Sequence, residues 1–230
     1  MTNIKAPFFE IGPKSYLYGE DILALALAAD AASEKYNVDI IFTCPVVDIR
    51  TVKQATRRIH VYAPHMDPIY PGRGLADILP ESLVAAGAEG VMLNHTEKPL
   101  TFEVLEQTIR RAEEVGLSTI VCADSLADAS RIAKLKPDII VAEPSELIGT
   151  GVSVGPEYVE AATKSVKDVD PGILVLTAAG ISNGTDVYNT IIAGADATGS
   201  SSGVAKAADR AAMVDEMIAA VRRGWNERHN

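Results

Sequence analysis

The chain has 230 residues, of which 47% are hydrophobic and 23% charged, and its formal net charge at pH 7 is −10. Nucleic acids and anionic membranes bind clustered Lys and Arg, so this acidic balance argues against both as partners. It does not exclude a small anionic substrate, which backbone N–H groups and one well-placed Lys can hold.

The predicted strands are short apolar segments that alternate with longer helical patterns along the chain. In chain order they are 6–11, 38–42, 59–63, 90–93, 118–122, 138–142, 172–176 and 195–198. Most are continuous apolar runs rather than in/out alternations, which is typical of parallel strands covered by helices.

Amphipathic stretches between the strands predict helices, among them 20–35, 101–115 and 207–223. Gly or Pro stands just before several strands, in joins such as GLSTI and KPDII, where a helix is expected to end. About eight such units at a spacing of roughly 25–30 residues predict one α/β domain over 1–230, a closed (β/α)8 barrel. The rival architecture is a doubly wound open sheet, but the first strand is followed by EIGPKSY, which has no G-x-G-x-x-G fingerprint.

The apolar runs and cysteines bear on the compartment. No apolar run reaches the roughly 20 residues of a membrane span, and the N-terminus lacks a signal-peptide pattern, so we expect a cytoplasmic protein. Cys44 and Cys122 each end an apolar run and show neither metal-ligand spacing nor a disulfide framework. We expect two buried thiols in a reducing compartment.

In a parallel barrel the active site is built by the loops at the carboxyl ends of the strands. This rule selects the chemistry-bearing residues that follow the predicted strands: Lys14, Cys44, His65, Asn94, His95, Glu97, Asp124 and Glu143. The four histidines of the chain are scattered, so we expect no metal and no cofactor.

Three of these side chains suit the enolisation of a carbonyl compound. Glu143 near a hydrophobic wall can abstract a proton next to a carbonyl, because desolvation raises its pKa. A neutral His95 can donate to the developing oxyanion, and the ammonium group of Lys14 can offset its charge. Each residue alone has a simpler interpretation: Lys14 as a surface lysine, His95 as a hydrogen-bonded structural residue and Glu143 as the cap of a turn. Together, all three would have to reach the same barrel mouth by accident.

Two Gly/Ser-rich turns are predicted after the seventh and eighth strands, Gly180-Ile181-Ser182 and Gly199-Ser200-Ser201. Such turns present backbone N–H groups, and phosphate sites recur at this place in barrels. The segment 143–151, EPSELIGTG, has Pro144 at its start and Gly149 and Gly151 near its end. That composition predicts a lid hinged at both ends, or else an ordinary loop.

Taken in order, these motifs resemble the triosephosphate isomerase family, and most closely its compact archaeal-type branch. LNHTEKP resembles the family's histidine motif, VAEPSELIGTG resembles its catalytic-glutamate and lid motif, and AAGISNG and SSGVAKA fall where the family binds phosphate. This family is itself a standard example of a Glu base paired with a neutral His and a closing lid.

The resemblance implies a role for each candidate residue. Glu143 would move a proton between C1 and C2, His95 would protonate the enediolate oxygens, and Lys14 would bind substrate and stabilise negative charge. The phosphate would be held by Gly149, Gly180, Ile181, Ser182, Gly199 and Ser200. The resemblance also implies a homo-oligomer, either a dimer or a tetramer.

Two positions depart from the family pattern. Gly12 stands where the family has Asn, two residues before the Lys, and Lys98, followed by Pro99, stands where the family has Arg. We expect the interconversion of dihydroxyacetone phosphate and glyceraldehyde 3-phosphate. The alternatives are the same proton transfer on a tetrulose phosphate or another ketose phosphate, and a non-catalytic barrel that binds a sugar phosphate.

Overall fold

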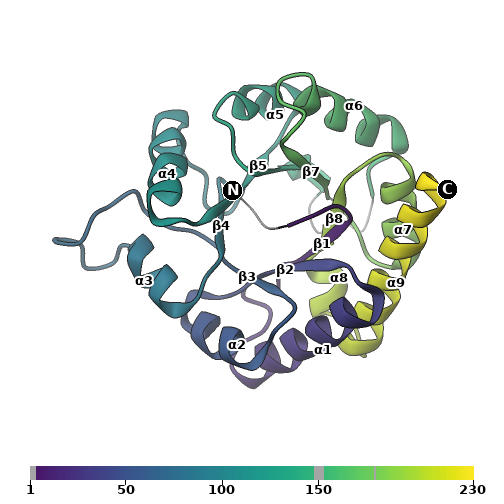
Figure 1. The fold of residues 1–230 in the computed structure, drawn as a ribbon, viewed down its shortest axis with the longest axis horizontal. Helices are drawn as coiled ribbons and strands as arrows, with labels where there is room; N and C mark the ends of the chain where they lie inside the picture. Colours follow the sequence, from purple (N-terminus) through teal and green to yellow (C-terminus); the bar gives the residue numbers. More distant parts are fainter. Residues whose placement is uncertain (1–3, 148–152, 179) are drawn as a thin grey trace.

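Parallel strands and the helices around them form a closed barrel (Figure 1). The computed structural model describes residues 4–147, 153–178 and 180–230. Within these residues the sheet runs in the order β1 to β8 and closes because β8 pairs with β1 in parallel. The predicted (β/α)8 barrel is therefore confirmed, and an open doubly wound sheet is excluded.

Every predicted strand is present, with ends within two residues of those predicted. The strands are β1 (Phe8–Ile11), β2 (Asp39–Thr43), β3 (His60–Ala63), β4 (Gly90–Leu93), β5 (Ser118–Ala123), β6 (Ile139–Ala142), β7 (Leu174–Thr177) and β8 (Ala197–Ser200). One boundary matters for the site, because Gly199 and Ser200 end β8 instead of lying in the predicted turn. Their pairing with Glu10 and Ile11 of β1 extends the strand.

The helices lie outside the strands. They are α1 (Glu20–Tyr36), α2 (Ile49–Ala55), α3 (Pro80–Ala86), α4 (Phe102–Val115), α5 (Leu126–Ala133), α6 (Pro156–Lys167), α7 (Gly184–Ile192), α8 (Ser202–Ala205) and α9 (Arg210–His229), with 3-10 turns at Val46–Asp48 and Ser145–Leu147. The helices predicted at 20–35 and 101–115 match α1 and α4 closely. The one predicted at 207–223 begins three residues later, at Arg210, and continues to His229.

Local sequence sets where helices begin and end. Thr101 caps α4 by accepting a hydrogen bond from Val104 N–H at its side chain, and Gly116 ends that helix at a φ of 79°. A side chain is strained at such a φ, so Gly is the favoured residue. Asn183 caps α7 in the same way, accepting from the N–H groups of Thr185 and Asp186. This cap fixes the direction of the chain just after the seventh loop.

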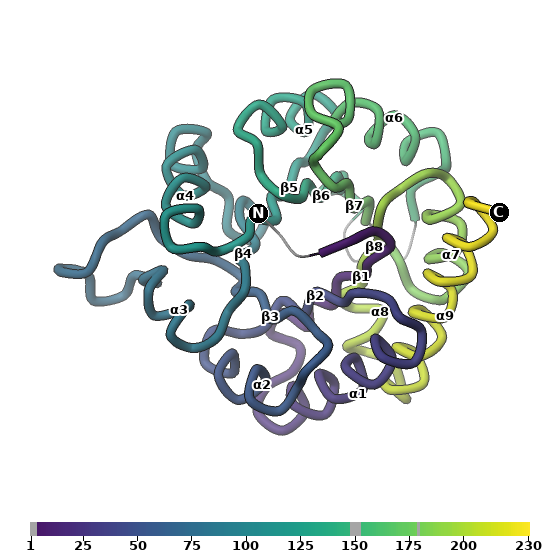
Figure 2. The backbone as a smooth tube through the Cα atoms, in the orientation of Figure 1, coloured from purple at the N-terminus to yellow at the C-terminus, as the bar shows by residue number. Residues whose placement is uncertain are grey.

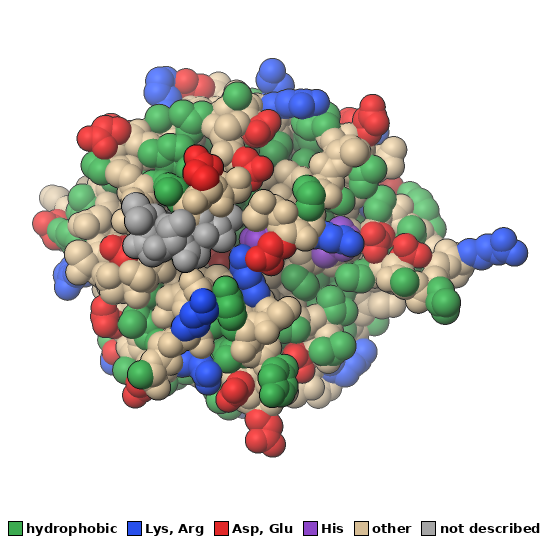
Figure 3. Space-filling view, turned by 180° about the vertical axis from the view of Figure 1, so that it is seen from behind, with side chains coloured by type: hydrophobic (Ala, Val, Ile, Leu, Met, Phe, Trp, Pro, Cys, Tyr) green, Lys and Arg blue, Asp and Glu red, His purple; other side chains and the backbone are tan. Residues whose placement is uncertain are grey.

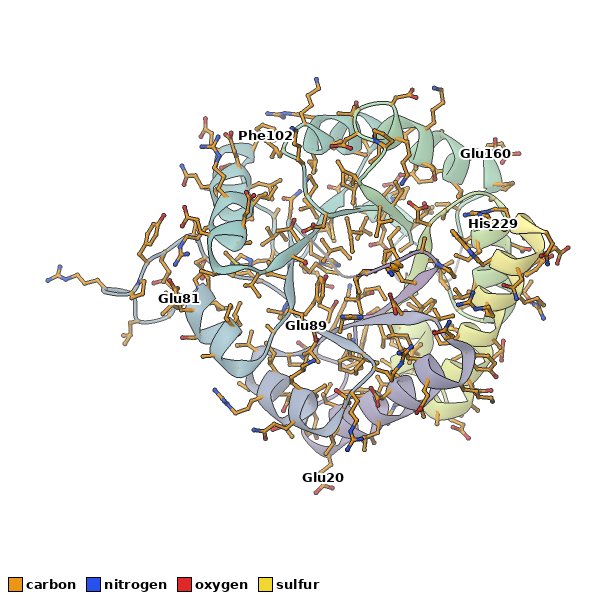
Figure 4. The ribbon with its side chains drawn as sticks, viewed as in Figure 1. Glu20, Glu81, Glu89, Phe102, Glu160 and His229 are labelled. Atoms are coloured by element: carbon orange, nitrogen blue, oxygen red, sulfur yellow. The ribbon has the colours of Figure 1, made fainter. Side chains whose placement is uncertain are left out.

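Two layers of apolar side chains hold the barrel together. One fills the interior, with Phe8, Ile41 and Tyr62 almost fully buried, and the other packs between strands and helices, with Phe9 and Ile11 at 0% exposure. Adjacent residues of β1 therefore face opposite sides. Side chains drawn as sticks extend from the strands both into the barrel and outward toward the helices (Figure 4).

One long loop extends outside the barrel, and a charged cluster lies at the end where the strands begin. The segment 64–79, between β3 and α3, projects from the side of the molecule (Figure 2). At the end where strands begin, Glu89 bonds His60 at 2.7 Å and Lys53 at 2.5 Å. Among the helices described, none is long and apolar enough to cross a membrane.

Candidate active site

A cavity of about 710 Å³ opens at the end of the barrel where the strands finish. It is lined by residues that follow β1, β2, β3, β4, β6, β7 and β8, and its floor is formed by side chains of the strands themselves. Its volume lies within the roughly 300–1,000 Å³ of small-molecule sites. Figure 3 shows this face, where Lys, Arg and His side chains gather near the centre together with acidic ones.

Glu143 stands at the rim directly after β6, where its backbone N–H donates to Ala123 O at 3.1 Å. Burial raises the pKa of its carboxyl to about 7, and the charges of Asp124 and Glu97 raise it further while Lys14 opposes them. A carboxyl group with this pKa is partly unprotonated at neutral pH and more basic than an exposed glutamate. It suits proton abstraction from a weak carbon acid.

His95 lies in the loop after β4 with its ring orientation fixed by the backbone. Its Nδ1 accepts a hydrogen bond from Glu97 N–H at 3.1 Å. An accepting Nδ1 carries no proton, so the neutral ring carries its proton on Nε2. Burial, and next the charge of Lys14, lower the pKa of His95. The loop therefore presents a neutral imidazole that can donate from Nε2.

Lys14 supplies a cation to the same cavity from the loop after β1. Its φ is 48°, a left-handed conformation, and its Nζ lies 3.2 Å from Glu97 Oε1. The Lys14 side chain is 22% exposed and that of Glu97 is 64% exposed. A pair with one partner so open to water contributes little stability, so the ammonium group can leave Glu97 for an anionic ligand at small cost.

The remaining candidates have structural contacts. Asn94, at a φ of 58°, donates to Cys122 O and accepts from Leu100 N–H, both at 3.0 Å, and so shapes the loop that carries His95. His65 lines the cavity and bonds Asp67 at 3.2 Å. Cys44 and Cys122 are free and buried, as predicted.

The two Gly/Ser-rich segments lie against each other at the cavity wall. Ser200 Oγ donates to Ile181 O at 2.8 Å, which joins the end of β8 to the seventh loop. A Cβ at Gly203 would stand 2.6 Å from Ile181 O, so only Gly permits this approach. Gly180, at a φ of 67°, and Ser182 also line the cavity, as does Gly199. The structure thus brings together the predicted residues of both turns.

The hydroxyl and N–H groups of these turns are not equally available. Ser182 donates both its N–H and its Oγ–H to Asp186 Oδ2, at 2.9 and 2.8 Å. Ser201 Oγ, by contrast, is buried with no hydrogen-bond partner among the described residues. In this state the Ser201 hydroxyl is available to an anion, whereas the N–H and hydroxyl groups of Ser182 already donate to Asp186.

The second half of the predicted lid segment 143–151 lies outside the described residues. Residues 148–152, which include Gly149 and Gly151, are not described, nor is residue 179. The predicted phosphate contact of Gly149 is therefore outside the described residues. Where the chain is described, no cluster of three or more His, Cys, Asp or Glu side chains has the geometry of a metal site.

One carboxyl group in the cavity was missed by the sequence reasoning. Glu10, in the middle of β1, is buried and lines the cavity floor. Thr43 Oγ1 donates to its Oε1 at 2.5 Å. The rule about strand ends selects only residues that follow strands. The signal for Glu10 in the sequence is a charged residue inside the apolar run FFEI, since buried carboxylates are rare.

Comparison with known proteins adds to this geometry. The family model described as triosephosphate isomerase matches residues 14–220. A protein of Sulfurisphaera tokodaii named triosephosphate isomerase is 36% identical, over 94% of this chain and 95% of its own length. Proteins with the same name from Saccharolobus solfataricus, at 35% over 94% and 96%, and Methanocaldococcus jannaschii, at 36% over 87% and 94%, are also similar.

Proposed function

The chain belongs to the triosephosphate isomerase family, and we propose that its cavity interconverts dihydroxyacetone phosphate and glyceraldehyde 3-phosphate with Glu143 as the base. The observation that carries the residue assignment is the raised pKa of Glu143, about 7, in a cavity that also holds a neutral His95 and the cation of Lys14. The family makes this enzyme an intramolecular oxidoreductase acting on a small sugar phosphate.

The reaction moves one proton between adjacent carbons. Glu143 takes the proton from the carbon next to the carbonyl group, and the electrons of that C–H bond form the enediolate. His95 Nε2–H donates to the oxygen that gains charge, and the ammonium of Lys14 offsets that charge. Glu143 then returns the proton to the neighbouring carbon, so no atom is gained or lost.

The phosphate of the substrate would bind where the seventh and eighth loops meet. The support is the contact of Ser200 with Ile181, the close approach of Gly203, and the buried, unpartnered hydroxyl of Ser201 in the described structure. The first N–H groups of helix α8 lack intrahelical acceptors. Binding would require Ser182 N–H to leave Asp186, and Gly180, Gly199 and Gly149 complete the proposed set.

We also propose a homo-oligomer, a dimer or tetramer of one-domain subunits in the cytoplasm. Exposed apolar side chains follow three neighbouring strands at the mouth end of the barrel: Tyr18 after β1 is 84% exposed, Val47 after β2 87%, and Leu75 after β3 104%. Large apolar side chains this exposed are available for a protein contact. Sedimentation of the purified protein gives the mass; a monomer at micromolar concentration would overturn this assembly.

A substrate screen tests the function. The purified chain is given ketose phosphates of three to six carbons, and the aldose phosphate formed is measured directly. We expect turnover with the triose pair, lost in Glu143→Gln, and retained in Glu89→Gln, a matched change at the opposite end of the barrel. Faster turnover of a four-carbon or longer ketose phosphate would overturn the triose assignment. Binding without turnover of any of them would identify a non-catalytic barrel.

A further inference from the structure

Apart from its hydrogen-bond partner Thr43, Glu10 stands among apolar side chains and one thiol on the cavity floor. The cavity floor is formed by strand residues whose side chains face the barrel interior: Met92, Cys122, Val141 and Leu176. Glu10 belongs to the same layer, since Phe8, two residues earlier on β1, also faces the interior. It is only 8% exposed and it lines the cavity, so the small exposed part faces the space a substrate would fill.

Two glycines make room for this carboxyl group. A Cβ at Gly12 would stand 2.9 Å from Glu10 Oε1, and a Cβ at Gly199 would stand 3.1 Å from Glu10 Oε2. A Cβ at 2.9 Å would force the oxygen to move, and one at 3.1 Å would require it to give by a few tenths of an ångström. The carboxyl group of Glu10 therefore fills the space that position 12 leaves without a side chain. Gly12 departs from the family pattern, which has Asn at this position. The polar group at this place in the cavity comes instead from Glu10, two residues earlier.

The two oxygens of Glu10 differ in their surroundings. Oε1 accepts the Thr43 hydroxyl at 2.5 Å, which fixes the orientation of the carboxyl group. Oε2 lies on the side of Gly199, the residue of β8 that pairs with Glu10 and has no side chain. A protonated Glu10 can thus accept from Thr43 with one oxygen and donate from the other.

Burial favours the protonated form of Glu10 near neutral pH. Burial raises its pKa to about 7; the Thr43 hydrogen bond lowers it, the charge of Glu143 raises it and that of Lys14 lowers it. The thiol of Cys122, on the adjacent floor, has a pKa raised by burial well above its usual range, so it stays neutral and adds no charge. Glu143 and Lys14 are thus the charged groups facing Glu10 in the described structure.

We propose that Glu10 contacts the substrate as a protonated carboxylic acid and donates a hydrogen bond to its reacting oxygens, beside His95 and Lys14. The proposal rests on the isomerase function given above and adds a group to that site. Glu10 keeps its proton throughout, and Glu143 alone takes the proton from carbon. A neutral donor held in an apolar site stabilises a developing oxyanion without first repelling it.

This arrangement requires one proton on the pair of carboxyl groups. With both protonated there is no base, and with both ionised Glu10 repels the enediolate and no longer donates. Two coupled carboxyl groups lose their protons in two macroscopic steps, so kcat/KM should rise and then fall with increasing pH. The pair is active in the window between the two steps.

The test compares Glu10→Gln with Glu10→Leu across pH 5.5 to 9. Gln reproduces the protonated acid, since its oxygen accepts from Thr43 and its NH₂ donates, but it does not titrate. We expect Glu10→Gln to keep kcat/KM within about threefold at the optimum and to lose the alkaline fall. Glu10→Leu should lower kcat/KM about 10²-fold at the pH optimum of the wild type, the size of one lost oxyanion donor, and should show no alkaline fall. Glu89→Gln should leave the profile unchanged.

The outcomes separate this proposal from the function itself. No turnover of any sugar phosphate by the wild type refutes the function. Turnover with the same alkaline fall in wild type and Glu10→Gln, or full activity in Glu10→Leu, refutes the role of Glu10 alone.

Infrared spectra give a readout that needs no activity. In a Glu143→Gln background, the protonated-carboxyl band should vanish on titration through pH 7, and Glu10→Gln should remove that change; its persistence would overturn the proposal.

Discussion

The acid side of the pH profile follows from the burial of Glu143. Its pKa of about 7, against an ordinary value of 4.5, means that the base is protonated as the pH falls through neutrality. A raised pKa on a base therefore removes activity at low pH. Lowering the pH from 7 to 5.5 reduces the ionised fraction of such a base, and with it the base's contribution to kcat/KM, by about 15-fold, whereas an ordinary carboxyl group would lose only about 10% of its ionised form.

The assay is the initial rate of isomer formation at low substrate concentration, because kcat/KM reports the ionisation of the free enzyme. The substrate's own phosphate ionises near pH 6 and contributes to the profile in every variant equally. The change Asp124→Asn isolates the enzyme's part, because it removes a charge that raises the pKa of Glu143. It should move the acid limb to lower pH. A wild-type kcat/KM that falls less than twofold between pH 7 and 5.5 would refute the reasoning.

Three further predictions concern single changes. Glu143→Asp should lower kcat at least tenfold in the isomerase assay, since misplacing the base by about 1 Å can cost roughly 10²-fold; unchanged turnover would remove it from the mechanism. Gly203→Ala should raise KM, because its Cβ would stand 2.6 Å from Ile181 O; Gly172→Ala, which meets only an aspartate side chain, is the control, and equal KM values would contradict the proposed phosphate site. The pKa of Glu10 is about 7 in the folded chain and about 4.5 in the unfolded chain. The free energy of unfolding should therefore fall by roughly 3 kcal/mol as the pH rises from 4.5 to 7. In urea unfolding, Glu10→Gln should be less sensitive to pH, and an unchanged pH dependence would contradict the raised pKa.

The fold could be predicted closely because the local signals agree with one another. Continuous apolar runs such as STIVC and DIIVA mark strands covered by helices, and a Gly such as Gly116 marks the helix end before a strand. The end of β8 was less accurate. Gly199 and Ser200 read as turn residues, but their pairing with β1 depends on barrel closure, which no local pattern contains.

The candidate site was predictable where residues follow strands directly. The rule about carboxyl ends of strands selects Lys14, His95 and Glu143, and all three line the cavity. Glu10 was missed because it lies within a strand, and its proximity to Gly12 appears only when the side chain is seen to turn into the mouth. The hydrogen bonds from Ser182 to Asp186 of α7 likewise depend on a side-chain orientation that spacing does not determine.

The most direct test of the account is proton exchange at carbon. Dihydroxyacetone phosphate is incubated with the chain in D₂O, and deuterium at C1 is followed by NMR. If Glu143 abstracts the carbon proton, deuterium should enter both the ketose and the aldose product, and Glu143→Gln should abolish its entry. Exchange that persists in Glu143→Gln, or none in the wild type, would contradict the assignment of Glu143 as the base.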